Sequence, residues 1–257
     1  MALRDKVNYN KTMTTQMTNS NKDNYWALVK HAYDLYPTIR HRKRFIINTL
    51  KKYIDKTRFS VFDYGIGNGT LLKDIKDMFN LSETDIGGCD ISSTAIELSK
   101  KKLHSPFLFN EQYPKLNKKF DVIVCSEVIE HTTQYKQSLE WIYNHLETTG
   151  ILILTTQSGK IYASDKYAGH TQHFKLSELN SLLKEIGFHI KYLRLWGFPF
   201  FTLQKYLTNY KFSSIKEDFL EGEPHIKQRF IFGFAYIIYY IHDFINFGPQ
   251  IYMVISK

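Results

Sequence analysis

Cysteine is scarce in this sequence. Only Cys89 and Cys125 occur among 257 residues, and each lies in an apolar stretch that we expect to form a buried strand. We therefore expect two reduced core residues rather than the disulfide framework of a small secreted protein. Residues 1–5 also lack the apolar core of a signal peptide. The expected location is accordingly the cytoplasm.

Long hydrophobic runs are also missing. Residues 230–241 form an aromatic-rich stretch of a dozen residues without a charge, which His242 and Asp243 end. A membrane-spanning helix needs about 20 residues, so the sequence predicts no membrane span. The preferred interpretation is a buried helix that covers the functional site. A peripheral membrane contact or a dimer face is the alternative, and the oligomeric state stays open.

Acidic residues are fewer than basic ones. Lysine and arginine number 34 against 25 aspartates and glutamates, which gives a formal net charge of +9. This charge favours anionic partners such as a phosphorylated small molecule, nucleic acid or acidic lipid. A lysine-rich surface explains the balance equally well. The basic run at residues 40–44 is interpreted as a solvated helix face.

Apolar stretches of strand length alternate with amphipathic stretches of helix length from residue 59 onward. Continuous apolar runs such as residues 120–125 are typical of strands buried on both faces of a parallel sheet. The alternation predicts an α/β fold with a doubly wound parallel sheet. The predicted strands cover residues 59–64, 85–90, 107–109, 120–125, 151–156, 189–196 and 250–256.

The chain is expected to form one domain with four parts. These are an N-terminal helical cap at residues 1–58, a core at 59–196, an aromatic helical insertion at 197–248 that serves as a lid over the acceptor, and a final strand at 249–257. Two local signals refine the core. The capping pair Thr94 and Glu97 is expected to open the helix after the second strand. Gly150 is expected to end the helix that begins near Tyr135.

Three alternating glycines follow the first predicted strand. The strand ends at Asp63 and Tyr64, and the turn carries Gly65, Gly67 and Gly69. Glycine lets the backbone adopt positive φ and lets a ligand lie against it, and N–H groups at the next helix start attract electron-rich groups. The spacing is one residue shorter than that of nicotinamide-binding proteins. It resembles motif I of the class I S-adenosylmethionine (SAM)-dependent methyltransferases.

This resemblance implies SAM as the cofactor, bound at the ends of the first four strands, where ligands of open α/β sheets bind. Asp90 ends the second strand before Ile91, and a carboxylate there can accept both hydroxyls of a ribose. The alternative for Asp90 is a helix-capping role before Ser92. Asn110 or Glu111, after the third strand, is expected to receive the adenine amino group.

The segment that follows the fourth strand carries further chemistry. Its residues 126–131 read Ser-Glu-Val-Ile-Glu-His and resemble the region after motif I in small-molecule methyltransferases, such as those of ubiquinone biosynthesis. The resemblance covers residues 40–196 and the last strand. It implies a Rossmann-like seven-stranded sheet whose last strand is antiparallel, with 59–196 as the SAM-binding core. The residues expected to bind the cofactor are Asp63, Tyr64, Gly65, Gly67, Asp90, Ile91, Asn110, Ser126 and Glu127.

Three histidines are candidates for a catalytic base, because imidazole is the natural base near neutral pH. His131, His170 and His173 all fall on loops at the expected rim of the site. His173 is slightly favoured because its loop follows the fifth strand, whereas His131 is equally compatible with packing against the methionine end of SAM. His170 and His173 are also spaced for metal binding, but we see no carboxylate cluster near them in the sequence and predict no metal.

The leading functional hypothesis is a SAM-dependent O-methyltransferase that acts on a small-molecule acceptor. The stretch 169–179 is similar to methyltransferases of bacterial cell-envelope gene clusters, which implies an anionic acceptor such as a nucleotide sugar or a phosphorylated capsule or lipopolysaccharide precursor. A tRNA or rRNA methyltransferase is the first alternative. Nucleic acid is not favoured, because Ser126-Glu127 stands where base-amine methyltransferases have Asn/Asp-Pro-Pro-aromatic. A non-catalytic SAM-binding partner protein is the second alternative.

Overall fold

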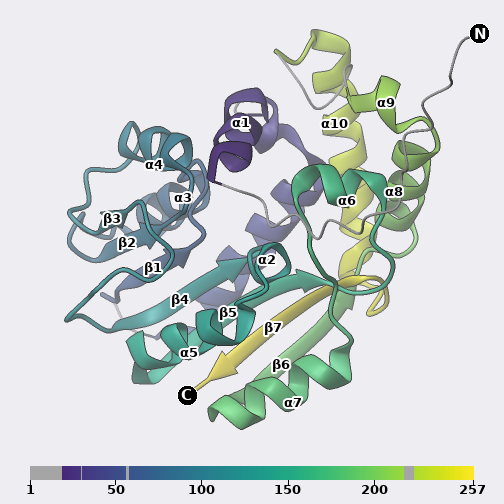
Figure 1. Cartoon of the computed structure of the whole chain (residues 1–257). Coiled ribbons are helices and arrows are strands. Elements are labelled where there is room, and N and C mark those ends of the chain that lie inside the picture. The colour runs from purple at the N-terminus through teal and green to yellow at the C-terminus, as the bar shows by residue number, and fades with distance from the viewer. Residues whose placement is uncertain (1–18, 30, 56–57, 217–222) are drawn as a thin grey trace, which may run out of the picture.

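A seven-stranded sheet forms the centre of the protein, in the order β3-β2-β1-β4-β5-β7-β6 (Figure 1). This computed structural model describes residues 19–29, 31–55, 58–216 and 223–257. The prediction of an α/β fold with seven strands is confirmed. The strands are β1 (Val61–Tyr64), β2 (Ile86–Cys89), β3 (Leu108–Phe109), β4 (Phe120–Ser126), β5 (Leu146–Gln157), β6 (His189–Trp196) and β7 (Gln250–Ser256).

Strand direction follows from the connections. The first five strands run parallel to one another, whereas β7 runs antiparallel to both β5 and β6. The antiparallel last strand is therefore confirmed as well. Because the carboxyl ends of β1, β2 and β4 meet at one edge, the loops that follow them converge there.

Two hydrophobic layers cover the sheet. Side chains alternate between its faces, so Val61 packs with α2 and α3 while the next residue, Phe62, packs with α5 and α7. Figure 1 shows α5 and α7 on one face and α2 on the other. These helices are α2 (Pro37–Tyr53), α3 (Thr70–Phe79), α4 (Ser93–Lys100), α5 (Tyr135–His145) and α7 (Leu176–Ile186).

Two local predictions were wrong. Gly150 does not end α5: the helix stops at His145, and β5 begins at once because Leu146 pairs with Phe120 of β4. The opening of α4 also differs, since Ser92 is the N-cap and its Oγ accepts a hydrogen bond from the backbone N–H of Ala95. A serine at the N-cap satisfies a helix-end donor as well as the expected Thr94 would have done.

The N-terminal segment and the insertion meet near the carboxyl edge of the sheet, although α2 itself packs on one face of the sheet. The N-terminal elements are α1 (Asn19–Val29), η1 (Tyr33–Leu35) and α2. The insertion between β6 and β7 contains α8 (Phe200–Tyr210), α9 (Phe212–Ile215), α10 (Ile226–Tyr239) and η4 (Tyr240–Asp243). Two short helices lie earlier in the chain: η2 (Ile129–His131) follows β4, and α6 (Ala163–Ala168) follows β5. The Arg44 guanidinium of α2 donates two hydrogen bonds to the Asp243 carboxylate, at 2.7 and 2.8 Å, and so fastens the end of the insertion to α2.

The apolar run at residues 230–241 is not the buried helix that the sequence predicted. Tyr239 is its one buried residue, whereas Phe230, Phe234 and Ile237 are each at least 66% exposed. One side of α10 packs against α2 and α8, and the other side has no described partner because the insertion is only one helical layer thick. In the described residues, no helix is both long and apolar enough to cross a membrane.

Candidate functional site

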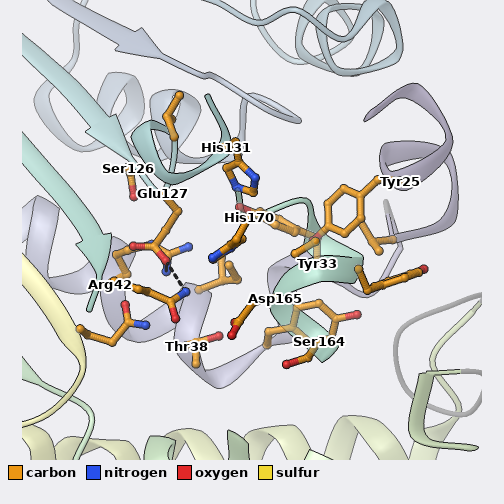
Figure 2. A pocket seen from close by; sticks show the side chains of 18 of the residues that line it. Tyr25, Tyr33, Thr38, Arg42, Ser126, Glu127, His131, Ser164, Asp165 and His170 are labelled. Atoms are coloured by element: carbon orange, nitrogen blue, oxygen red, sulfur yellow. Dashed lines mark hydrogen bonds and ion pairs between the residues drawn. The ribbon is translucent and has the colours of Figure 1, made fainter. Parts of the chain in front are cut away.

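A cavity of about 960 Å³ opens at the carboxyl edge of the sheet (Figure 2). Its floor comes from the loops after β1, β2, β3 and β4, and its walls come from α1, α2, α6, α8 and α10. Of the residues singled out from the sequence, those that line it are Tyr64, Gly65, Asp90, Ile91, Glu111, Ser126, Glu127, His131 and His170. Asp63 and Gly67 instead line a much smaller hollow behind the glycine loop.

Two positions of the glycine loop, Gly65 and Gly67, require glycine. Gly65 adopts φ +85°, and a Cβ there would come within 2.3 Å of the Val128 side chain. Gly67 adopts φ +56°, and a Cβ there would come within 2.5 Å of the Trp26 indole of α1. The close approach at Gly67 is therefore to a side chain of this chain, which lies against the loop and lines the cavity.

Asp90 connects the ends of β1 and β2. Its Oδ2 accepts a hydrogen bond from Gly67 N–H at 3.0 Å, and its Oδ1 accepts one from Ser92 N–H at 2.9 Å. Burial raises the pKa of this carboxyl group above its ordinary value. Each carboxylate oxygen retains capacity for a further donor. The carboxylate therefore both holds the glycine loop and presents acceptor capacity to the cavity.

The residues after β3 differ in position. Asn110 is exposed, and its Nδ2 donates to the backbone carbonyl of Asp90. Glu111 and Gln112 line the cavity instead. Gln112 also donates from Nε2 to Ser138 Oγ at 3.3 Å, which anchors this stretch to α5.

The helix α1 covers the side of the cavity that the glycine loop and Asp90 form. Asp23 accepts hydrogen bonds from Ser92 Oγ and Thr94 N–H, so it attaches α1 to the start of α4. Trp26 is 9% exposed and packs against Tyr33 at a ring distance of 4.8 Å. The first 18 residues of the expected cap lie outside the described residues.

Glu127 is the most constrained residue of the site. It is one of two non-glycine residues with positive φ in the described chain, at +56°. Its carboxylate accepts hydrogen bonds from Thr155 Oγ1 at 3.0 Å and Gln157 Nε2 at 3.1 Å, and it pairs with the Arg42 guanidinium at 3.5 Å. Such strain persists only where the surroundings over-determine it and is common at functional sites.

The position of Arg42 corrects the interpretation of the basic run. That run is not a solvated face: His41 is fully buried and Arg42 is only 7% exposed. The helical period turns these two residues toward the sheet, where Arg42 meets Glu127. Burial and the nearby Arg44 charge lower the pKa of His41 to about 2.

A polar chain that the sequence analysis missed crosses the cavity wall. Lys205 of α8 donates to Gln157 Oε1 at 2.9 Å and pairs with the Asp165 carboxylate at 3.0 Å. Asp165 in turn accepts a hydrogen bond from Tyr162 N–H at 2.7 Å. No local motif marks Lys205 or Gln157, because the two residues lie 48 positions apart in the chain.

The three histidines lie together but not equivalently. His131 and His170 line the cavity with their rings 4.7 Å apart, whereas the His173 side chain is only 2% exposed and lies behind His170. His170 Nδ1 and His173 Nε2 are 2.9 Å apart, and His173 Nδ1 lies 3.2 Å from the Gly159 carbonyl. Burial is the main cause that lowers all three pKa values, that of His170 to about 4.

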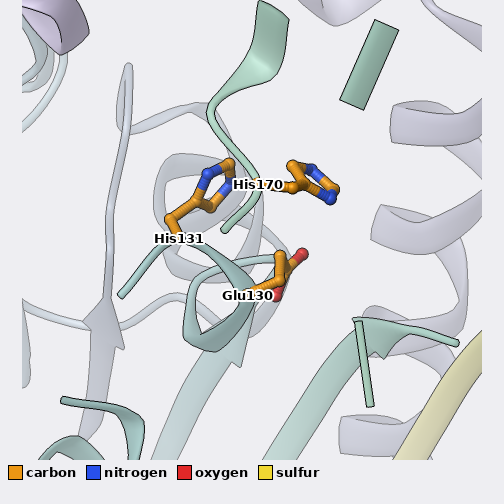
Figure 3. Close-up of side chains that lie close together, drawn as sticks. All are labelled: Glu130, His131 and His170. Atoms are coloured by element: carbon orange, nitrogen blue, oxygen red, sulfur yellow. The ribbon is translucent and has the colours of Figure 1, made fainter. Parts of the chain in front are cut away.

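Carboxylates do lie beside these histidines, contrary to the sequence-based expectation. Figure 3 shows Glu130 and His131 projecting from one turn beside His170. The side-chain atoms of these three residues that could bind a metal ion lie within 4.8 Å of one another. The same holds for Asp165, His170 and His173. Glu130 Oε1 and His131 Nδ1 are buried without a hydrogen-bond partner. The prediction of no metal rested on the expectation that no carboxylates lie near these histidines, and that expectation was wrong.

A comparison with known families identifies the chain. Residues 38–193, from α2 to β6, match a family that is described as a methyltransferase domain. This chain belongs to the methyltransferase domain family.

Two curated relatives of the chain have the same name but come from different species. The ubiquinone biosynthesis O-methyltransferase of Rickettsia typhi is 29% identical over 118 residues, which cover 45% of this chain and 48% of that protein. The enzyme of the same name from Rickettsia canadensis is 25% identical over 60% of this chain and 72% of its own length. The chain spans about half the length of the first curated relatives that it matches.

Solved methyltransferase-type structures share the fold at low identity. A cyclopropane synthase from Mycobacterium tuberculosis has a TM-score of 0.61 at 12% identity, with 94% of this chain and 99% of that chain covered. Phosphoethanolamine N-methyltransferase 2 of Haemonchus contortus, in complex with SAM, has a TM-score of 0.58 at 17% identity, over 95% of this chain and 58% of its own. These likenesses establish the fold of the chain.

The contact between Gly67 and Trp26 generates a prediction. Gly67→Ala should lower the free energy of unfolding by about 1–3 kcal/mol more than Gly159→Ala, because only the first Cβ meets a ring. Gly159 is the matched control, since it also has positive φ (+84°) but a Cβ there would have nothing within 4 Å. Urea unfolding followed by circular dichroism measures both values. Equal losses in the two variants would contradict the contact.

Proposed function

We propose that this protein is a SAM-dependent O-methyltransferase whose acceptor is a small molecule with a hydroxyl group and a largely apolar body. The observation that carries the proposal is His170, a neutral imidazole that faces a cavity bounded on its other side by the glycine loop and Asp90. Membership of the methyltransferase domain family supports the same activity.

The floor of the cavity fits the cofactor. Gly65 offers backbone without a Cβ at the cavity surface, and Asp90 offers carboxylate oxygens at the end of β2 to accept ribose hydroxyls. Glu111 and Gln112 lie where the adenine side would be held, whereas Asn110 supports Asp90 from outside. Bound SAM supplies an electrophilic methyl group on a sulfonium sulfur.

The hydrogen bonds of His170 and His173 determine which ring nitrogen of His170 carries the proton. A carbonyl oxygen only accepts, so His173 Nδ1 carries the proton that it donates to Gly159. His173 Nε2 is then the acceptor, and His170 Nδ1 donates to it. His170 Nε2 is left without a proton, and no described residue donates to it. We assign His170 as the base and His173 as a positioning residue that sets its tautomer, in place of the preference for His173 that the sequence suggested.

His131 is the second candidate for the base. It lines the cavity, it hydrogen-bonds the backbone of Gly169, and its Nδ1 has no partner. Burial and the positive charge of Lys22 lower the pKa of His131 well below its ordinary value. His170 is preferred because a second histidine orients its ring, which a base requires for aligned proton transfer.

The acceptor class follows from the base and from the walls. A base whose pKa is about 4 removes a proton more readily from an acidic hydroxyl, such as that of a phenol, than from a sugar alcohol. The aromatic and aliphatic lining includes Tyr25, Phe200, Leu207 and Ile238. Three Lys and Arg residues line the cavity: Arg42 and Lys205 are paired with carboxylates, and Lys22 lies close enough to Asp90 to interact with its charge. A nucleotide sugar or another anionic precursor therefore ranks behind a hydrophobic phenol.

Cofactor binding can be tested at Asp90. Asp90→Ala should weaken SAM binding by about 1.5–3 kcal/mol, the value of hydrogen bonds to a charged group. Asp90→Asn is the matched variant: it keeps one acceptor for a backbone N–H and should lose less. Isothermal titration calorimetry measures both affinities, with circular dichroism to confirm folding. Unchanged SAM affinity in Asp90→Ala would remove Asp90 from the proposed site.

The base can be tested with an alkyl catechol as the acceptor. His170→Ala should lower kcat by at least about a hundredfold, because a positioned base contributes roughly 10²–10⁴-fold, while SAM affinity persists. His173→Ala should lower kcat less. His104→Ala, on the exposed surface, is the control and should leave kcat unchanged.

The pH profile gives an independent readout. Since burial lowers the pKa of His170 to about 4, its neutral form persists at pH 6.5 and is lost only as the pH falls toward 4. The value of kcat/KM, which reports the free enzyme, should therefore stay level from pH 8 to about pH 5 and fall to about half near pH 4. An acidic limb centred on 6.5 that persists in His170→Ala would assign the base to another residue.

A further inference from the structure

The insertion exposes an unusual number of large apolar side chains. On α8, Leu203, Tyr206, Leu207 and Tyr210 are each at least 52% exposed. Their spacing of i, i+3, i+4 and i+7 places them on one side of the helix. The opposite side of α8 faces inward, where Lys205 bonds Asp165. This helix is therefore amphipathic with its apolar side turned outward.

The helix α10 has the same organisation. Ile226, Phe230, Phe234 and Ile237 lie on one side of the helix and are between 66% and 73% exposed. The other side is held in place, since the Arg40 guanidinium lies 3.8 Å from the centre of the Tyr236 ring. The outward side chains are therefore displayed by a helix that is firmly packed on its inner side.

The two helices adjoin, and both display apolar side chains outward. Tyr239 of α10 donates a hydrogen bond to Gln204 of α8, and Figure 1 shows the two helices side by side. Phe244 and Phe247, after η4, extend the exposed apolar set at 88% and 62% exposure. We call this surface, made of the outward side chains of α8 and α10 with Phe244 and Phe247, the α8–α10 face. Exposed apolar patches on this scale are typical of interaction sites.

We propose that the α8–α10 face docks on the surface of an anionic phospholipid bilayer. The first argument is continuity with the cavity. Leu203, Leu207 and Ile231 are all more than half exposed, and all three also line the cavity. A bilayer on this face would let an apolar ligand pass between the lipid and the cavity without crossing water. A second protein copy bound there would instead cover the entrance.

The second argument is charge. Lys211 follows α8, and Lys227 and Arg229 lie in the first turn of α10, all three exposed. None of them forms an ion pair with a described residue, so their charges are available to lipid headgroups. Glu223, the nearest described acid in sequence, pairs with His31 at 2.9 Å. Basic residues beside an apolar helix face are typical of helices that lie in the membrane interface.

The third argument is helix length. With 11 residues in α8 and 14 in α10, neither helix approaches the about 20 residues needed to span a bilayer. The helices therefore lie along the surface, with aromatic rings at the level of the headgroups. Docking of this kind involves no residue of the proposed base or cofactor site, so its test is independent of methyl transfer.

Vesicle flotation tests the docking. The full chain is mixed with vesicles of phosphatidylcholine alone, or of phosphatidylcholine with phosphatidylglycerol, and the floating fraction is measured at low and high salt. The wild-type chain should float with the anionic vesicles, and less so at high salt. Phe230→Gln/Phe234→Gln should weaken the partition by at least about tenfold, because two exposed phenyl groups no longer enter the lipid.

Met78→Gln is the matched control, since Met78 is 52% exposed on α3, outside the α8–α10 face, and its replacement should leave flotation unchanged. Circular dichroism and SAM affinity should be the same in all variants. Three outcomes would overturn the proposal. The first is no flotation of the wild-type chain, and the second is equal flotation of the double variant. The third is a dimer in light scattering that the double variant dissociates, which would assign the face to a second copy.

Discussion

The site depends on one carboxylate in a strained backbone position. Glu127, just after β4, has positive φ and is kept there by Thr155 and Gln157 of β5 and by Arg42 of α2. Because Gln157 also bonds Lys205, and Lys205 pairs with Asp165, the constraint extends from the sheet to α8 and α6. One connected set of polar contacts therefore fixes the sheet edge and two walls of the cavity relative to one another.

This polar chain also explains the division of the cavity. On one side lie the glycine loop and Asp90, and on the other lie the aromatic and aliphatic walls of α8 and α10. The charges of Arg42 and Lys205 are offset by carboxylate partners within the cavity wall.

Local patterns in the sequence predicted the fold and the tight glycine turn after the first strand. The alternation of strands and helices and the glycine loop depend on neighbouring residues, and both are seen in the sheet and in the positive φ of Gly65 and Gly67. Asp90 was singled out because it ends a strand next to that loop. The same reasoning did not separate Asn110 from Glu111, since β3 has only two residues and the exposed Asn110 bonds the Asp90 carbonyl.

The wall of the cavity opposite the glycine loop was not predictable in the same way, because its residues come together only on folding. Lys205 and Gln157 belong to elements far apart in the chain, and the buried position of Arg42 depends on a partner that follows β4. The position of His173 was hidden for a similar reason: spacing alone does not say that its side chain is buried against His170. The exposed side of α10 was mistaken for a core because composition does not show which partners a helix has.

The most direct test of the account is the product formed from methyl-labelled SAM. The purified protein is incubated with an alkyl catechol, a nucleotide sugar and transfer RNA in separate reactions, and products are analysed by mass spectrometry. The account predicts a methyl ether on a catechol hydroxyl, with little label in the other two acceptors. Labelling of the RNA or of the sugar alone, or transfer to nitrogen, would contradict it.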